Sequence, residues 1–187
     1  MMDQILELDR DLLLYLNNLG RPAWDSFWLV VTNKLTFIPL YILLFYLMCK
    51  NLSQKAILFL VLTLAAMVTF TDQVTNLFKF GFERLRPCAQ EGVVEFIRQS
   101  ECWGYGFFSG HSSNSMATAI FTILMLKSPK TKFIYLMLPW SILVGYSRIY
   151  LGVHYPLDVL VGWSFGVLSG ALFYTLFKYL ERRFVVV

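Results

Sequence analysis

Residues 157–179 have the sequence LDVLVGWSFGVLSGALFYTLFKY, in which the only charged side chains, Asp158 and Lys178, lie close to the two ends. At a rise of about 1.5 Å per residue, a helix of this length spans about 34 Å. The hydrocarbon core of a bilayer is about 30 Å thick, so the run predicts a transmembrane helix.

Four more apolar runs precede this one, and the composition agrees with a membrane protein. The runs are Ser26–Cys49, Ala56–Phe78, Ser112–Leu126 and Phe133–Ile149, of which the third is short for a bilayer. Of the 187 residues, 57% are hydrophobic and 15% charged, against about 25% charged in soluble domains. The net charge of +4 comes mostly from Lys and Arg between the apolar runs, which favours membrane topology over nucleic-acid binding. We expect an all-α integral membrane helical bundle with about five transmembrane helices, forming a single domain over residues 1–187.

The segment 1–22 has the pattern of an amphipathic helix. Its apolar residues recur in steps of three and four and so share one stripe, while the other face is charged. The stripe consists of Ile5, Leu8, Leu12, Leu16 and Leu19, and the charged face of Glu7, Asp9, Arg10 and Asp11. Gly20 and Pro22 are typical helix-ending residues. We expect this helix to lie in the membrane interface, and its early acidic residues do not fit a cleavable signal peptide.

The distribution of Lys and Arg predicts the orientation of the bundle. One side carries eight of them, namely Lys50, Lys55, Lys127, Lys130, Lys132, Lys178, Arg182 and Arg183. The other side carries seven, namely Arg10, Arg21, Lys79, Arg84, Arg86, Arg98 and Arg148. Three of these seven, Lys79, Arg86 and Arg148, are candidate phosphate ligands, and without them the count is eight against four. The first side is therefore expected to be cytoplasmic, and the loop 80–110 to face outward.

Two of the three cysteines, Cys88 and Cys102, lie in this outer loop, while Cys49 ends the first apolar run on the opposite side. An oxidising outer compartment permits disulfides. We expect a Cys88–Cys102 bridge, with two free thiols as the alternative.

Three short motifs collect most of the unusual polar residues. They are KFGFERLRP at 79–87, FSGH at 108–111 and SRIYLGVHYPLD at 147–158. Each lies at the end of an apolar run, and alternating topology places all three on one side of the membrane. Both histidines of the chain, His111 and His154, belong to this set.

The motifs contain what a small dianion such as phosphate requires. Lys79, Arg86 and Arg148 supply three cations, two of which have the forked geometry that matches phosphate oxygens. Ser109 and Gly110 precede an expected helix, whose N-terminus presents free N–H groups and a positive dipole end. We therefore expect a phosphate-binding site built from these five residues.

The same motifs contain reactive groups. Asp158 follows His154 by four residues, so its carboxylate can fix the imidazole tautomer and leave the other ring nitrogen free to attack. His111 can protonate the leaving oxygen and then deprotonate water. No residue cluster suits a metal, and three cations can support phosphoryl transfer without one. We expect no cofactor.

Each residue also has a structural interpretation. Arg86 or Arg148 alone could anchor a helix at the interface, His154 could make a bundle hydrogen bond, and Asp158 could favour a helix N-terminus. Six ionisable groups at matching ends of apolar runs are costly near lipid, however, so the joint pattern indicates function. Asp72 and Asn76 share a helical face with Lys79 and either support it or make a polar contact inside the bundle.

The three motifs resemble the signature of the type 2 phosphatidic acid phosphatase family, which shares its core with vanadium haloperoxidases. That signature is Lys, six residues, Arg-Pro; then Pro-Ser-Gly-His; then Ser-Arg, five residues, His, three residues, Asp. The only departure is Phe108 in place of proline. The resemblance implies phosphate binding by the five residues named above. It also implies a phosphohistidine on His154, orientation by Asp158, and acid–base catalysis by His111.

We therefore expect an enzyme that hydrolyses a phosphate ester or diphosphate on an outer-leaflet lipid of a bacterial cytoplasmic (inner) membrane, with its site facing the periplasm. Lipid A phosphate or undecaprenyl diphosphate is favoured, with phosphatidylglycerophosphate and phosphatidic acid as alternatives. A vanadium haloperoxidase and a non-catalytic lipid transporter are the rivals from other classes. The expected partners are the bilayer and the lipid substrate, with no nucleic acid and no obligate protein partner.

Overall fold

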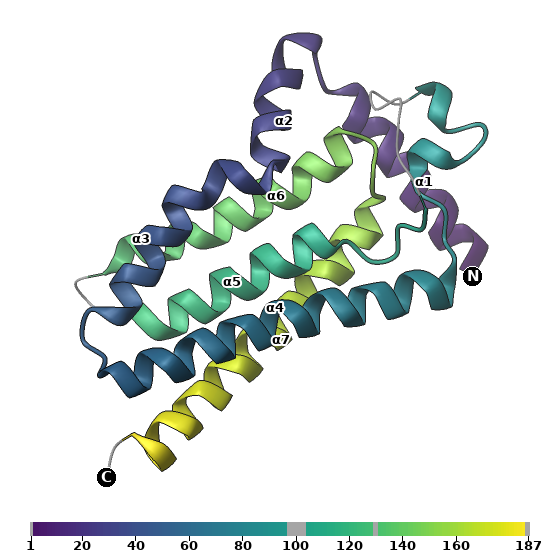
Figure 1. The fold of residues 1–187 in the computed structure, drawn as a ribbon. Helices are drawn as coiled ribbons and strands as arrows, with labels where there is room; N and C mark the ends of the chain where they lie inside the picture. Colours follow the sequence, from purple (N-terminus) through teal and green to yellow (C-terminus); the bar gives the residue numbers. More distant parts are fainter. Residues whose placement is uncertain (1, 97–103, 129–130, 186–187) are drawn as a thin grey trace.

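The structure of the chain, a computed structural model, describes residues 2–96, 104–128 and 131–185. Within these ranges it contains seven α-helices and no β-strand, apart from one isolated bridge between Leu85 and Tyr105 (Figure 1). The helices are α1 (Met2–Asn18), α2 (Asp25–Thr32), α3 (Ile38–Cys49), α4 (Gln54–Phe82), α5 (Gly110–Leu126), α6 (Met137–Tyr150) and α7 (Pro156–Phe184). The all-α membrane bundle expected from the sequence is confirmed.

Helix α5 lies inside the bundle, where it contacts α3, α4, α6 and α7. Its contact with α7 is the closest, because α7 presents Gly162, Gly166 and Gly170 to the backbone of α5. A Cβ atom on these glycines would lie 2.6, 2.5 and 2.6 Å from carbonyl oxygens of α5 or its N-cap residue. Small residues at four-residue spacing allow helix backbones to approach closely in membranes.

Within the described parts of the chain, two single helices, α4 and α7, are long and apolar enough to cross a membrane. The run Ser26–Cys49 differs from the continuous span expected, because α2 and α3 are bent by 62° at a break. Asn33 interrupts the helix with an extended backbone, and its side chain accepts a hydrogen bond from the N–H of Leu35 at 2.9 Å. The chain thus turns where a polar pair, Asn33 and Lys34, follows α2.

The remaining two apolar runs form shorter helices. α5 has 17 residues and α6 has 14, with a 3-10 helix at Lys132–Leu136 leading into α6. At about 1.5 Å per residue, α5 spans roughly 25 Å, which agrees with the short third run.

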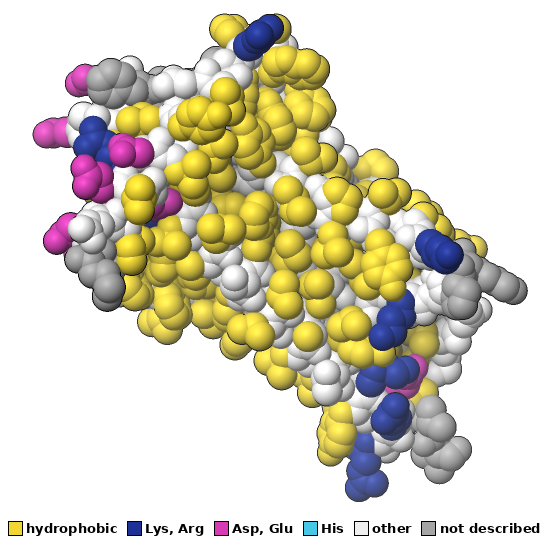
Figure 2. Space-filling view, turned by 180° about the vertical axis from the view of Figure 1, so that it is seen from behind, with side chains coloured by type: hydrophobic (Ala, Val, Ile, Leu, Met, Phe, Trp, Pro, Cys, Tyr) yellow, Lys and Arg dark blue, Asp and Glu magenta, His cyan; other side chains and the backbone are white. Residues whose placement is uncertain are grey.

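The lipid-facing character of the bundle is visible on its surface. Figure 2 shows a broad apolar surface between a basic end, at the C-terminal end of α7, and an acidic end beside α1. Large apolar side chains of α4 and α7 are exposed, including Leu62, Leu77, Leu168 and Leu172. Bilayer hydrocarbon covers such a surface at no cost.

Helix α1 lies across the end of the bundle where α4 ends and α7 begins (Figure 1). Four members of its apolar stripe are exposed, namely Ile5, Leu8, Leu12 and Leu19. The side of the helix that carries Leu13 and Asn17 is docked, since Leu13 is fully buried and Asn17 donates to the carbonyls of Ile149 and Tyr150 at 3.2 and 2.7 Å. An exposed apolar stripe on a docked helix agrees with the interfacial helix expected from the sequence, whose position in the membrane stays a prediction.

Helix α4 is longer than the run Ala56–Phe78, because Phe80 and Phe82 continue it. It ends where Glu83 adopts a left-handed backbone with φ of 48°. Residues 80–82 of the expected outer loop are therefore helical, and Gly110 is the first residue of α5.

Candidate active site

The two residues of the expected catalytic pair meet at the start of α7. Pro156 is the first residue of that helix, Tyr155 caps it, and Asp158 occupies the third helical position. Nδ1 of His154 lies 3.4 Å from Oδ2 of Asp158, and the side chains are 2% and 0% exposed. Burial lowers the pKa of His154 to about 4, although the Asp158 carboxylate opposes this shift. The imidazole is therefore neutral at physiological pH, as a nucleophile requires.

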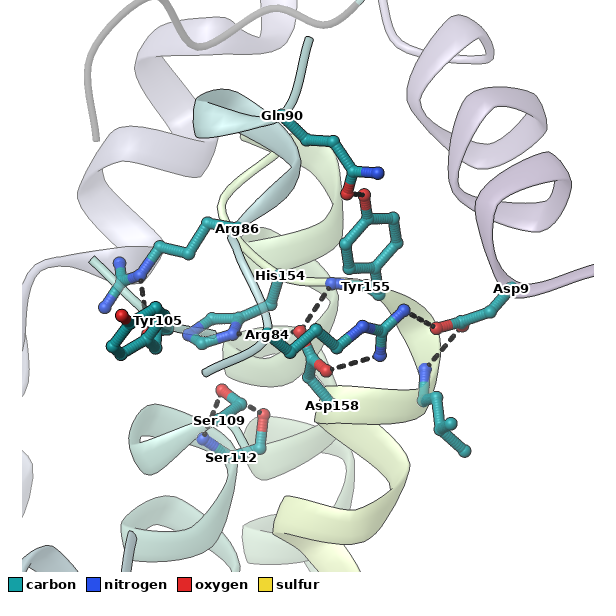
Figure 3. Close-up of polar contacts among 11 residues, drawn as sticks. Asp9, Arg84, Arg86, Gln90, Tyr105, Ser109, Ser112, His154, Tyr155 and Asp158 are labelled. Carbon is teal, nitrogen blue, oxygen red and sulfur yellow. Dashed lines mark hydrogen bonds and ion pairs between the residues drawn. The ribbon is translucent and has the colours of Figure 1, made fainter. Parts of the chain in front are cut away.

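Asp158 is held by three hydrogen bonds, of which Figure 3 shows the two that its carboxylate accepts from Tyr155 and Arg84. Its Oδ2 accepts a hydrogen bond from the N–H of Tyr155 at 3.0 Å, which closes a capping box. Its Oδ1 accepts from Nη1 of Arg84 at 2.8 Å. Its backbone carbonyl accepts from the N–H of Ser109 at 3.0 Å. The last contact joins the first turn of α7 to the N-terminus of α5.

Arg84 and Asp9 were not expected at the site. Nη2 of Arg84 donates to Oδ2 of Asp9 at 2.7 Å, and the guanidinium carbon lies 4.1 Å from the ring centre of Tyr155. The other carboxylate oxygen of Asp9 accepts from the N–H of Leu157 at 2.8 Å. Burial raises the pKa of Asp9, and Arg84 and the Leu157 N–H oppose this. In the sequence both residues look like surface charges near a membrane, so no local signal identifies them.

The three expected cations come from different elements. Lys79 lies in the last turn of α4, Arg148 in the last turn of α6, and Arg86 just after α4. Each lies within electrostatic reach of another, and the charges of Arg86 and Arg148 also act on His154. Such a convergence of positive charge beside a buried imidazole favours binding of an anion.

The backbone and side-chain contacts of these cations fix their positions. Nε of Arg86 donates to the carbonyl of Tyr105 at 3.2 Å. Nη1 of Arg148 donates to the hydroxyl of Thr32, the last residue of α2. The Nε of Arg148 is buried and has no hydrogen-bond partner among the residues that the structure describes. A buried donor without a partner is costly, so a ligand at this position would satisfy it.

Ser109 and Gly110 form the N-terminus of α5 as expected. Ser109 is fully buried, and its hydroxyl accepts from the N–H and the hydroxyl of Ser112 at 3.4 and 3.0 Å. Phe108, which stands where the family has proline, is buried against Phe78 and Phe165. It therefore packs the turn before α5.

His111 lies in the first turn of α5 and lines a cavity of about 400 Å³ between α2, α3, α4, α5 and α6. The charges of Arg148, Lys79 and His154 all act on His111, so the two histidines lie within electrostatic range of each other. The cavity walls away from His111 are mainly apolar and include Leu44, Phe45, Met48, Leu64, Met67, Phe121 and Val144. A polar end beside the cations and an apolar body suit an amphiphilic ligand.

Asp72 and Asn76, which were expected to support Lys79, lie in different surroundings. Asp72 lines the cavity and accepts a hydrogen bond from the side chain of Asn114 at 2.6 Å, and its charge acts on Lys79. Asn76 is exposed on α4.

Cys88 is buried, but Cys102 lies outside the described residues, so their bridge stays a prediction. Among the described residues, no three His, Cys, Asp or Glu side chains gather as a metal site.

A model of the PAP2 superfamily matches residues 54–182, which contain all three motifs. The chain belongs to the PAP2 superfamily. It is similar to lipid A 4'-phosphatases of Bacteroides thetaiotaomicron and Porphyromonas gingivalis, with 34% identity to each. Both matches cover 98% of this chain, and they cover 83% and 79% of those proteins.

The fold is shared with the crystal structure of a transmembrane PAP2 type phosphatidylglycerolphosphate phosphatase from Bacillus subtilis. The TM-score is 0.72 at 22% identity, over 96% of this chain and 89% of that chain. Together, the family and its relatives make this PAP2 protein a membrane-embedded phosphoric ester hydrolase that acts as a lipid phosphatase. The family and these relatives favour a phosphatase over a haloperoxidase or a non-catalytic transporter.

Proposed function

We propose that this PAP2 enzyme hydrolyses a phosphate monoester of lipid A, with the 4' phosphate as the favoured group to be removed. The observation that carries the proposal is the buried His154–Asp158 pair beside three converging cations, in a chain that aligns over 98% of its length with lipid A 4'-phosphatases. The apolar body of the cavity beside His111 supports a lipid as the substrate.

The proposed reaction has two displacements. In the first, Nε2 of His154 attacks phosphorus while the bond to the sugar oxygen breaks, and His111 donates a proton to that oxygen. In the second, His111 removes a proton from water, the water oxygen attacks phosphorus, and the N–P bond breaks to release inorganic phosphate. Asp158 supports the imidazole through Nδ1, which leaves Nε2 as the attacking nitrogen.

The remaining site residues bind the transferred phosphoryl group. Lys79, Arg86 and Arg148 would bind its three non-bridging oxygens, and the N-terminus of α5 at Ser109–Gly110 would add backbone N–H donors. In the transition state the negative charge of the transferred group is spread over its three non-bridging oxygens, so these donors stabilise it and lower the barrier.

A polyprenyl diphosphate is the second candidate, and Lys34 favours it. Lys34 lies at the break between α2 and α3, lines the cavity with His111, and is close enough for its charge to act on both His111 and Lys79. A fourth cation suits a second phosphate. In that case Lys34→Gln should raise the KM for a diphosphate lipid and leave the KM for a monophosphate lipid unchanged.

The decisive experiment measures phosphate release by purified protein in detergent. Bisphosphorylated lipid A, undecaprenyl diphosphate, phosphatidylglycerophosphate and phosphatidic acid are offered separately, and the lipid A product is mapped by mass spectrometry. We expect the fastest release from lipid A, with loss of the 4' phosphate. Faster turnover of any other lipid would assign the enzyme to that substrate.

We also propose that the protein lies in the bacterial inner membrane with its site facing the periplasm. The basic end of the surface, near the C-terminal end of α7, is then cytoplasmic, in line with the positive-inside rule. A reporter that is active only in the periplasm should stay silent when fused after residue 187. A membrane-impermeant thiol reagent should label Cys49 poorly in intact cells, and strong labelling would reverse the orientation.

A further inference from the structure

A buried chain of three charged residues connects helix α1 with the catalytic pair. The guanidinium of Arg84 contacts Asp9 of α1 at 2.7 Å and Asp158 of α7 at 2.8 Å. The side chains of these residues are only 17%, 5% and 0% exposed, in the same order. Figure 3 shows Arg84 lying between the two carboxylates, on the side of Asp158 away from His154.

The charges of Asp9, Arg84 and Asp158 together set the electrostatic potential at His154. With Asp9 ionised, the charges of Asp9 and Arg84 cancel, and Asp158 keeps a full negative charge toward the imidazole. Without the Asp9 carboxylate, Arg84 would be paired with Asp158 alone and would draw that charge away from His154. Interactions between buried charges are strong because little solvent screens them.

Asp9 also fixes the backbone on which the catalytic carboxylate stands. Its Oδ1 accepts a hydrogen bond from the N–H of Leu157, the residue immediately before Asp158. The face of Arg84 is covered by the ring of Tyr155, whose hydroxyl donates to Gln90 at 2.6 Å. The first turn of α7 is therefore held by a side chain from α1 as well as by its own capping box.

We propose that Asp9 and Arg84 are positioning residues through which the interfacial helix α1 holds Asp158 behind His154. This inference rests on the proposed function of the His154–Asp158 pair. Arg84 contacts the carboxylate of Asp158 and Asp9 contacts Arg84 and the Leu157 N–H, so both would act on the reaction through Asp158. The apolar stripe of α1 is exposed while Asp9, beside it on the same helix, is buried, so binding of α1 to the membrane surface would be coupled to the positioning of Asp158.

The test compares kcat and KM of four variants on the best lipid of the substrate panel. Asp9→Asn keeps the size of the side chain and removes its charge, whereas Asp9→Glu keeps the charge. Asp11→Asn and Glu7→Gln, at exposed positions of the same helix, are the matched controls. We expect Asp9→Asn to lower kcat by tenfold or more with KM changed less than twofold. Losing the hydrogen-bond partner of a metal-ligating side chain typically costs roughly 10–100-fold in activity, and we expect a loss of similar scale for the partner of Asp158. Asp9→Glu should recover most of the loss, and both controls should match the wild type.

A double-mutant cycle separates positioning from folding. If Asp9 acts through Arg84, the double variant Asp9→Asn/Arg84→Met should lose no more kcat than Arg84→Met alone. Losses that multiply, or a kcat of Asp9→Asn equal to that of the controls, would refute the inference. A loss of kcat in Asp9→Asn that Asp9→Glu does not recover would also refute it. So would a loss of kcat that arises because Asp9→Asn melts below the assay temperature. A wild type that releases phosphate from no lipid would instead overturn the proposed function, and the inference with it.

Discussion

Nδ1 of His154 and Oδ2 of Asp158 are 3.4 Å apart in a place that solvent barely reaches. This distance exceeds the usual 2.7–3.2 Å of a hydrogen bond, and active-site contacts commonly shorten when a ligand binds. Burial and the carboxylate act in opposite directions on the imidazole, and burial dominates. His154 is therefore neutral in the resting site. We expect its contact with the Asp158 carboxylate to shorten when the ring becomes positively charged during the reaction.

The first prediction concerns the nucleophile. His154→Ala should abolish phosphate release, because no other side chain would form the covalent intermediate. Losing the nucleophile of a hydrolase reduces kcat by about 10⁶-fold in a well-studied case. The measurement is phosphate release by variant and wild type at matched concentration, after both elute as folded protein in detergent. Residual activity above a few per cent would exclude His154 from this role.

The second prediction concerns the charge of His154. Its pKa should lie near 4, well below the ordinary value of 6.5, because burial penalises the imidazolium. The chain has two histidines, so NMR of protein labelled in the imidazole rings gives two titrations, and His111→Asn assigns them. The His154 signals should keep their neutral positions as the pH falls from 8 to about 5. A midpoint near 6.5 would show an exposed ring and contradict the buried geometry.

Most of the helices could be predicted from the sequence, because apolar runs in a membrane protein have few alternatives to a helix. The break at Asn33 could not, since one polar pair in an apolar run is equally compatible with an intact helix near the interface. The end of α4 could not either. The apolar run was expected to end at Phe78, whereas Phe80 and Phe82 continue the helix and the backbone leaves it only at Glu83.

The site shows the same division. Residues of the three motifs converge because alternating helices return their ends to one side of the membrane. Asp9 and Arg84 were missed because a charged residue on an amphipathic helix or in an outer loop ordinarily faces water. Only the three-dimensional position of α1 over the start of α7 brings Asp9 within 2.7 Å of Arg84.

The third prediction concerns the contact between α5 and α7. Gly162→Ala should destabilise the protein by about 1–3 kcal/mol, since the new methyl group would meet the Ser109 carbonyl at 2.6 Å. Activity should fall as well, because Ser109 caps the helix that would bind phosphate. Gly81→Ala is the control, since an added Cβ there meets nothing within 4 Å. Thermal melting in detergent measures both variants, and a Gly162→Ala melting curve like that of Gly81→Ala would contradict the close helix contact.

The fourth prediction concerns metal. Activity should survive EDTA, because Lys79, Arg86 and Arg148 supply the positive charge that a phosphoryl group requires. Orthovanadate should inhibit competitively by occupying the phosphate position. Loss of activity on chelation, with recovery on adding magnesium, would show that a metal takes part.

The last prediction concerns the division of work between the two histidines. His111 should be needed twice, to protonate the leaving oxygen and to activate water. Nitrophenyl phosphate has a good leaving group and needs little protonation. With this substrate, His111→Ala should slow hydrolysis of the phosphoenzyme more than its formation, so acid-labile phosphoenzyme should accumulate.

The size of this effect makes it measurable. General acid–base assistance is typically worth about 10²–10⁴-fold, so the intermediate of His111→Ala should persist long enough for rapid quenching. With ³²P-labelled substrate, label should appear on His154 in the His111→Ala protein and be absent from His154→Ala. Label on His111, or label retained by His154→Ala, would mean that the two roles are exchanged. The same experiment with a lipid substrate should show little accumulation, because its poor leaving group makes the first step depend on His111 as strongly as the second.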